Sequence, residues 1–150
     1  MNLHSKLWLL LLAFTFIPSA RGQSNSDIVL QHRVIANRLT AGEAGTVTLE
    51  LSVEKGFKLG KRPAPKLQFT PNPNFQVTNR VSFEEASAGK DPEYFGEIKP
   101  LKISILPKKD LRTGEYDMDG KISFIYCSEK ENYCARSSTD IKIPLIIAEK

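Results

Sequence analysis

The sequence predicts an all-β protein built as an antiparallel β-sandwich, and three observations support that prediction. Apolar and polar residues alternate strictly over 46–53, which is typical of a strand with one buried face. The same alternation returns over 101–105 and again over 116–126. Glycine and proline turns separate these segments, and no segment of useful length has a helical period. About seven short strands at this spacing indicate two packed sheets.

In chain order, each expected strand is a short run of apolar and β-branched residues that ends at a turn. The runs cover 27–36, 46–53, 66–71, 75–83, 101–105, 116–126 and 139–147. The turns between them contain Ala41-Gly42, Lys55-Gly56, Pro71-Asn72-Pro73, Ala88-Gly89 and Thr113-Gly114. We expect one basic cluster to form a solvated, proline-bearing loop, and its members are Lys55, Lys58, Lys61, Arg62 and Lys66.

The first 22 residues have the composition of a secretory signal peptide. Lys6 precedes an unbroken apolar run over 7–17, and small residues follow at Ala20 and Gly22. This run is far shorter than the roughly 20 residues that a membrane-spanning helix needs. We therefore expect residues 1–22 to be cleaved. Residues 23–150 are then expected to form one domain that is periplasmic or otherwise exported, without a membrane anchor.

The charge of the chain argues against nucleic acid as a partner. The formal net charge is +4, and Lys6 and Arg21 of the expected signal peptide contribute two of the positive charges. Domains that bind nucleic acid usually carry a much stronger basic excess. We therefore expect no nucleic-acid partner.

The chain has two cysteines, Cys127 and Cys134, with six residues between them. Exported cysteine pairs are usually oxidised to disulfides, and most of these disulfides are structural. The expected inner residues of the last two strands are Ile122, Phe124, Tyr126, Ile141, Ile143 and Leu145. Both cysteines have the opposite parity, which predicts that they lie on the outer face, where another thiol can reach them. Two roles stay open: a staple across a hairpin, or a working redox pair.

Several segments around the cysteines resemble, in order, one known family. The segments are GFKLGKRPAPKLQF (56–69), EYFGEIKPLKISI (93–105) and GEYDMDGKISFIYC (114–127), followed by the second cysteine and IKIPL. Together they resemble the N-terminal periplasmic domain of the bacterial thiol:disulfide interchange protein DsbD. The resemblance covers about residues 45–147 and rests on the ordered set of segments.

This resemblance implies an immunoglobulin-like β-sandwich that relays electrons through a cysteine pair. Cys127 and Cys134 match the redox pair of the family. In the family, that pair takes electrons from a membrane-embedded donor and passes them to disulfide isomerases and thioredoxin-like proteins. We expect no cofactor and no bound metal.

The resemblance also implies a short cap loop over the cysteines. The matching residues are Glu93, Tyr94, Phe95 and Gly96. Tyr94 is the expected lid over the sulfur atoms, and Phe95 is the alternative. Strand alternation predicts that one of these two aromatic side chains packs in the core instead. An aromatic lid would keep small thiols and oxidants away from the pair until a partner displaces it.

The chain departs from the family pattern in two ways. The spacer SEKENY has six residues, where the pattern has four or five. The family domain is normally fused to a transmembrane segment and a thioredoxin-like domain, so we expect the electron donor here to be a separate protein. The charges near the pair leave open which cysteine attacks, and we expect Cys134 to be the one that reduced partners engage. The acidic residues Glu129 and Glu131 are expected to raise the pKa of nearby thiols, and Lys130 and Arg136 to lower it, so the two effects oppose each other.

Other chemistries lack the residues that they need. His32 is the only histidine outside the expected signal peptide, and it belongs to the first strand rather than to the hairpin. One histidine and two cysteines also fall short of a zinc set. The enzyme assignment therefore stays open between two functions. The chain is a thiol:disulfide oxidoreductase if the pair cycles, and a non-catalytic β-sandwich that binds a protein partner if the disulfide is a hairpin staple.

Overall fold

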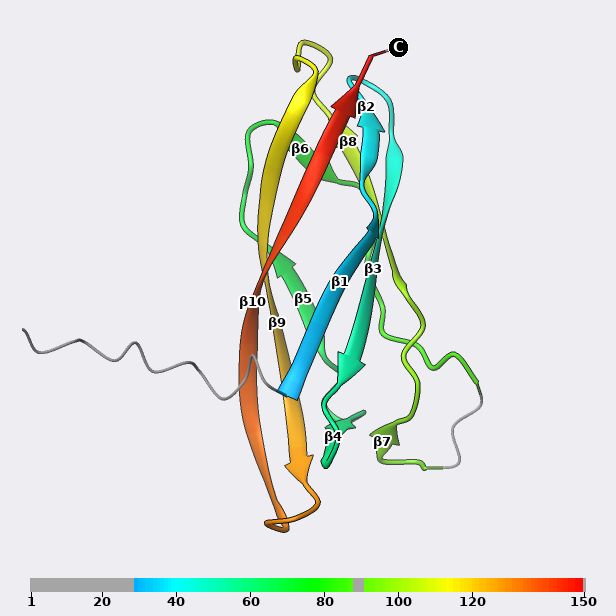
Figure 1. The fold of residues 1–150 in the computed structure, drawn as a ribbon, viewed down its shortest axis with the longest axis vertical. Coiled ribbons are helices and arrows are strands. Elements are labelled where there is room, and N and C mark those ends of the chain that lie inside the picture. Colours follow the sequence, from blue (N-terminus) through cyan, green and yellow to red (C-terminus); the bar gives the residue numbers. More distant parts are fainter. Residues whose placement is uncertain (1–28, 88–90, 150) are drawn as a thin grey trace, which may run out of the picture.

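A computed structural model describes residues 29–87 and 91–149 of the chain (Figure 1). All its elements are strands, which confirms the all-β prediction. They are β1 (Leu30–Ala36), β2 (Arg38–Thr40), β3 (Gly45–Val53), β4 (Phe57–Gly60), β5 (Lys66–Phe69), β6 (Phe75–Val77), β7 (Tyr94–Phe95), β8 (Leu101–Pro107), β9 (Gly114–Ser128) and β10 (Tyr133–Ala148). The expected signal peptide and the Ala88-Gly89 turn lie outside the described residues.

The strands form two sheets. The first sheet has the order β1-β3-β8-β6, and the second has the order β2-β10-β9-β4-β7, with β5 also paired to β9. All strand pairs are antiparallel except the short β2–β10 pair, which is parallel. Strands β9 and β10 form one hairpin that runs along the whole length of the molecule in Figure 1. The tip of this hairpin carries both cysteines.

One hydrophobic core joins the two sheets into a β-sandwich. Alternate residues of β3 and β8 are buried in the first sheet, and alternate residues of β9 and β10 are buried in the second. The fully buried side chains from both sheets include Val47, Leu49, Leu59, Ile103, Ile105, Ile122, Ile143 and Leu145. Each such burial contributes about 1.5–3 kcal/mol, so the packing of the two inner faces is the main source of stability.

The parity predicted for the last two strands is confirmed. Phe124 and Tyr126 of β9 are buried, whereas Cys127 is only partly buried on the other face. The β9–β10 pairing continues from Gly114 to Ser128 without a register shift. The inner and outer sets therefore keep their phase up to the cysteines.

The expected strand over 75–83 is shorter than predicted, because β6 ends at Val77. From there a side chain takes the place of a strand partner. The Asn79 side-chain amide donates to the carbonyl oxygen of Lys102 (2.9 Å), and its oxygen accepts from the amide of Ser104 (2.8 Å). Asparagine can satisfy backbone groups in this way and so compete with a regular ladder.

Three short strands, β2, β4 and β7, were not predicted, because runs of two to four residues are too short for alternation to show. Strand β4 corrects part of the expectation that the basic cluster forms a solvated loop. Lys58 lies on β4 and Lys66 begins β5, so the basic cluster is not simply a solvated loop. Lys61 follows β4 directly, and its side chain is only 20% exposed.

A glycine inside β9 allows β5 to lie close to it. Gly120 faces the interior, and a Cβ added there would lie 3.0 Å from the carbonyl oxygen of Gln68. It would also lie 3.1 Å from Cδ1 of Phe69 and 3.2 Å from Cγ1 of Ile141. The missing side chain thus makes room for the β5 crossing.

Within the described residues, no helix has the length and apolar character needed to cross a membrane.

Candidate functional site at the hairpin disulfide

Cys127 of β9 lies directly opposite Cys134 of β10, and the two form a disulfide with Cα atoms 4.0 Å apart. Both residues belong to the outer face of the second sheet, as the parity predicted. Cys134 is exposed, whereas Cys127 is partly buried. Cys134 as a residue is therefore more accessible to another molecule than Cys127.

The six-residue spacer does not loosen the hairpin. Ser128 and Tyr133 pair with each other, so only residues 129–132 form the loop. The amide of Asn132 donates to the carbonyl oxygen of Ser128 (3.0 Å), and Asn132 adopts a left-handed conformation with φ of 52°. Asparagine tolerates this conformation better than most residues. The long spacer thus adds one strand pair beyond the cysteines.

Three aromatic residues pack on the inner side of the hairpin tip. The ring of Tyr126 makes edge contacts with Phe57 and Tyr133, with centroids 5.7 and 6.1 Å away. The hydroxyl groups of Tyr126 and Tyr133 lie 3.3 Å apart. This hydrogen bond is the main reason that the pKa of Tyr133 is raised above its ordinary value of 10.0. The rings support the strands that carry the disulfide.

Tyr94 lies against the sulfur of Cys127 on the outer face. Its hydroxyl oxygen is 3.4 Å from Sγ of Cys127. A disulfide sulfur carries no proton, so the tyrosine hydroxyl is the donor. Phe95 has the opposite orientation, because it pairs with Leu59 and packs against the core. The prediction that one of the two adjacent aromatic residues is a core residue is confirmed for Phe95.

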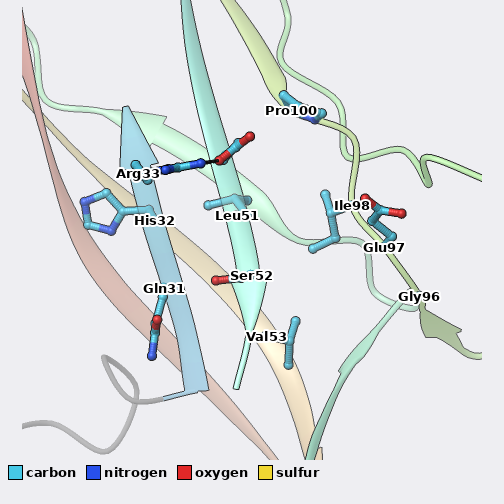
Figure 2. A pocket seen from close by; sticks show the side chains of 11 residues that line it. Gln31, His32, Arg33, Leu51, Ser52, Val53, Gly96, Glu97, Ile98 and Pro100 are labelled. Carbon is cyan, nitrogen blue, oxygen red and sulfur yellow. Dashed lines mark hydrogen bonds and ion pairs between the residues drawn. The ribbon is translucent and has the colours of Figure 1, made fainter. Parts of the chain in front are cut away.

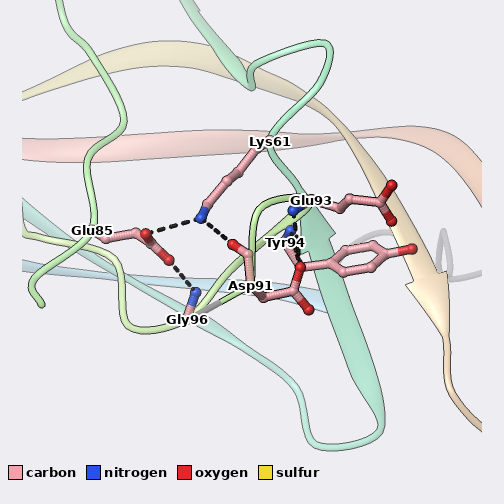
Figure 3. A network of polar contacts seen from close by, with 6 residues as sticks. All are labelled: Lys61, Glu85, Asp91, Glu93, Tyr94 and Gly96. Carbon is pink, nitrogen blue, oxygen red and sulfur yellow. Dashed lines mark hydrogen bonds and ion pairs between the residues drawn. The ribbon is translucent and has the colours of Figure 1, made fainter. Parts of the chain in front are cut away.

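A network of polar contacts holds the segment that carries Tyr94 (Figure 3). One oxygen of Asp91 accepts from the amides of Glu93 (2.9 Å) and Tyr94 (3.2 Å). The Lys61 ammonium donates to the carbonyl oxygen of Asp91 (2.6 Å) and pairs with Glu85 (2.9 Å). These contacts tie the turn before β7 to the residue that follows β4.

The same network reaches the end of the cap loop. The Glu85 carboxylate also accepts from the amide of Gly96 (2.8 Å), and Lys61 lies 5.8 Å from the centre of the Phe95 ring. The Lys61 and Glu85 side chains are only 20% and 15% exposed. Ion pairs that are largely shielded from water are screened less than surface pairs. This pair therefore fixes the position of the cap loop.

Lys58 brings a positive charge next to the disulfide. It lies opposite Cys127 in the β4–β9 register, so the two side chains project on the same face with Cβ atoms about 4.5–5.5 Å apart. Its ammonium pairs with Glu129 (3.2 Å) and lies 5.5 Å from the centre of the Tyr94 ring. A neighbouring cation favours the thiolate form of a cysteine.

Both cysteines line an open pocket of about 390 Å³ on the outer face. The other lining residues are Gly60, Arg62, Pro92, Glu93, Tyr94 and Ile125. Gly60 has no side chain to fill this space. A thiol that enters the pocket meets the disulfide beside the Tyr94 hydroxyl and the Arg62 guanidinium, with Lys58 opposite Cys127 in the register.

The predicted site residues therefore do not all lie at the sulfur atoms. The structure brings together Cys127, Cys134 and Tyr94, with Glu93 at the same pocket. Phe95 and Gly96 instead contact the core and Glu85.

Lys58 and Lys61 both contribute to the site, although neither was predicted as a site residue. The signal that could have found Lys58 is its place between the apolar residues Phe57 and Leu59, which is compatible with a short strand that has Lys58 on its outer face, although so short a run does not establish a strand by itself. The partnership of Lys61 with Glu85 spans 24 positions and has no local signature.

Another pocket, of about 650 Å³, lies away from the disulfide (Figure 2). Strands β1 and β3 and the segment before β8 line it, and Arg33 and Glu50 form an ion pair across the two strands. His32 belongs to this region, as the sequence predicted, and not to the hairpin. No group of three potential metal ligands occurs in the part of the chain that the structure describes. The chemistry of the disulfide therefore marks the smaller pocket as the candidate site.

No protein-family model matches this chain, and a search of curated proteins finds no match either.

Proposed function

We propose that this protein is a thiol:disulfide exchange module that relays electrons through Cys127 and Cys134. One observation carries the proposal: the two sulfur atoms lie on the outer face, at an open pocket, with Tyr94 placed on one of them. A disulfide that only stabilises the hairpin needs neither the pocket nor the hydroxyl donor. The core of the sandwich is also large enough that this hairpin does not depend on a staple.

The exposed sulfur is the one that a partner attacks. Thiol–disulfide exchange requires a thiolate to approach one sulfur while the other leaves. Tyr94 covers Cys127, whereas Cys134 is exposed. The thiolate of a reduced partner therefore attacks Sγ of Cys134 and forms a mixed disulfide. The Cys127–Cys134 bond breaks, and Cys127 leaves with the electron pair as a thiolate.

Two groups stabilise the leaving thiolate of Cys127. The Tyr94 hydroxyl already donates toward this sulfur, and such a hydrogen bond strengthens when the acceptor becomes charged. The Lys58 ammonium, opposite Cys127 in the register, favours the same charge. The second thiol of the partner then attacks its own sulfur in the mixed disulfide and releases Cys134 as a thiolate. The partner is oxidised, this protein is reduced, and the reverse sequence delivers both electrons to an acceptor disulfide.

We infer that the fold is immunoglobulin-like and that the chain is related to the N-terminal domain of DsbD. The ordered segments support this inference, since three of them meet at the disulfide as β4, β7 and the end of β9. On this inference the protein works in the periplasm or another exported compartment. Its donor is a membrane-embedded protein, and its acceptors are thioredoxin-like proteins or disulfide isomerases.

Trapping a mixed disulfide tests this function. The oxidised protein is mixed with a reduced thioredoxin whose second active-site cysteine has been replaced by serine, so the thioredoxin cannot resolve the mixed disulfide. Free thiols are then alkylated at once, so that the released cysteine of this protein cannot reverse the reaction. Peptide mapping then identifies the cysteine that carries the thioredoxin. We expect the adduct on Cys134 in the wild type, and on both cysteines in Tyr94→Ala, because Cys127 is then uncovered. Tyr94→Phe is the matched control, since it keeps the ring over Cys127 and should keep the preference for Cys134.

The result against the function is equally clear. If no adduct forms until the protein is unfolded, the disulfide is a hairpin staple. The alternative of a non-catalytic protein-binding sandwich would then account for the chain.

A further inference from the structure

We propose that the outer face beside the disulfide is a groove for an extended, acidic peptide segment, in which the redox partner presents its cysteine. This inference rests on the proposed function and specifies the partner that the site accepts. The groove consists of the disulfide pocket and a second, more apolar pocket next to it. Ile125 lines both, so the two pockets adjoin at β9.

The path of the chain after β4 creates the second pocket. Strands β4 and β5 pair with the same edge of β9, but β4 pairs with residues 126–128 and β5 with residues 120–123. Between β4 and β5 the chain leaves the sheet. On that edge of β9, Phe124 and Ile125 therefore have no backbone pairing partner from β4 or β5. The resulting space of about 200 Å³ is lined by Pro63, Ala64, Phe124 and Ile125, together with polar residues. It suits one apolar side chain next to the partner's cysteine.

The charges around this groove are not balanced. Arg62 lines the disulfide pocket, and Lys66 and Arg136 line the apolar pocket. Within the described residues, Glu93 is the only acidic residue that lines either pocket. Among the described residues, none forms an ion pair with these three cations. The groove therefore presents an excess of positive charge to a ligand.

The excess of positive charge is confined to the part of the outer face near the cysteines. Farther along the hairpin, Lys121 pairs with Asp140 (3.4 Å) and Lys142 pairs with Asp117 (3.6 Å). There each cation has an acidic residue nearby on the neighbouring strand, as stable sheets prefer. Near the cysteines Lys58 pairs with Glu129, but among the described residues the groove-lining cations Arg62, Lys66 and Arg136 have no such partner. Acidic side chains on a bound segment would supply such partners, so charge complementarity favours an acidic occupant over a neutral or basic one.

Two short peptides provide the test. Each has a central cysteine between leucines, and one has aspartate at both ends whereas the other has lysine. The rate of mixed-disulfide formation with the oxidised protein is divided by the rate with hydroxyethyl disulfide, which is uncharged. This division removes the effect of the peptide charges on their own thiols. We expect the normalised rate to be about tenfold higher for the acidic peptide at low salt, and the difference to shrink as salt screens the charges.

Paired charge-removing variants locate the effect. Replacing both Lys66 and Arg136 with serine should reduce the tenfold ratio to nearly one. The control replaces Lys121 and Lys142 with serine, which removes the same charge from the far half of the face and should leave the ratio unchanged.

The possible outcomes distinguish a failure of the proposed peptide groove from a failure of the proposed exchange function. Equal normalised rates for the two peptides, or an equal loss of the ratio in the control variant, would overturn the groove while leaving the exchange function intact. If neither peptide reacts with the folded protein, both proposals are wrong.

Discussion

Replacing Lys61 with methionine should loosen the cap loop and destabilise the protein by about 2 kcal/mol. Its ammonium pairs with Glu85 at 2.9 Å and donates to the Asp91 carbonyl oxygen at 2.6 Å. Removing one partner of a fully buried ion pair costs about 3–5 kcal/mol, whereas an exposed pair contributes about 0.2–1 kcal/mol. The Lys61 and Glu85 side chains are 20% and 15% exposed, so the cost lies between these limits. Methionine keeps most of the apolar stem and removes the charge.

A neighbouring ion pair supplies the matched control. Lys99 pairs with Glu84 at 3.1 Å, but these side chains are 52% and 61% exposed. Lys99→Met should therefore cost less than about 0.5 kcal/mol. Thermal unfolding should show a decrease of about 8 °C for Lys61→Met and about 2 °C or less for Lys99→Met, at roughly 4 °C per kcal/mol for a domain of this size.

Hydrogen exchange shows which part of the structure loses stability in Lys61→Met. The Gly96 amide donates to Glu85, so its protection should fall by about 30-fold in Lys61→Met, the factor that corresponds to about 2 kcal/mol. Amides in the centre of β9 should change only as much as global stability does. If Lys61→Met and Lys99→Met have equal effects on both stability and Gly96 protection, the buried pair does not hold the cap loop, and this reasoning is refuted.

Three further predictions follow from contacts around the hairpin. In the reduced protein, Lys58→Met should slow alkylation of Cys127 at neutral pH by about threefold, because the thiolate loses a neighbouring cation; an unchanged rate would show that the charge does not act on this sulfur. Gly120→Ala should cost about 1–3 kcal/mol in chemical unfolding, since the new Cβ would lie 3.0 Å from a backbone oxygen of β5, and an unchanged midpoint would contradict the close approach. Tyr126→Phe should lower the pKa of Tyr133 toward 10.0 in an absorbance titration. Because the pKa of Tyr133 is raised in the folded protein, the hydrogen bond stabilises the fold fully below pH 10.0, and this stabilisation is lost as the pH rises through the pKa of the folded state. The wild type and the variant should therefore differ less in stability at strongly alkaline pH.

Much of the sandwich could be predicted from the alternation of residues. The strict pattern in 46–53 and 101–105 corresponds to β3 and β8, and the parity of residues 122–126 correctly placed the cysteines on the outer face. These elements are long enough for a period of two to be visible, and one of their faces is fully buried. The predicted length of 75–83 was wrong, since the Asn79 side chain replaces the strand partner there.

The site was less accessible to sequence reasoning, because its parts come from separate segments. The cysteine hairpin is local, and the aromatic pair at 94 and 95 stood out through the family resemblance. The contact between Tyr94 and Cys127 spans 33 positions, and the partnership of Lys61 with Glu85 depends on how β4 and the residues before β7 come together. Single-residue patterns carry no record of such pairings. A charged cluster also has the same composition whether it is solvated or packed beside a disulfide.

The most direct test of the account is the reduction potential of the Cys127–Cys134 disulfide in the folded protein. The protein is equilibrated with glutathione buffers of known ratio, and the fraction of free thiols is read by trapping and mass spectrometry. A potential near or above about −250 mV lies among the exchange proteins, and this is the result that the account predicts. A potential below about −300 mV is typical of structural disulfides, and it would contradict the redox function while leaving the fold unchanged.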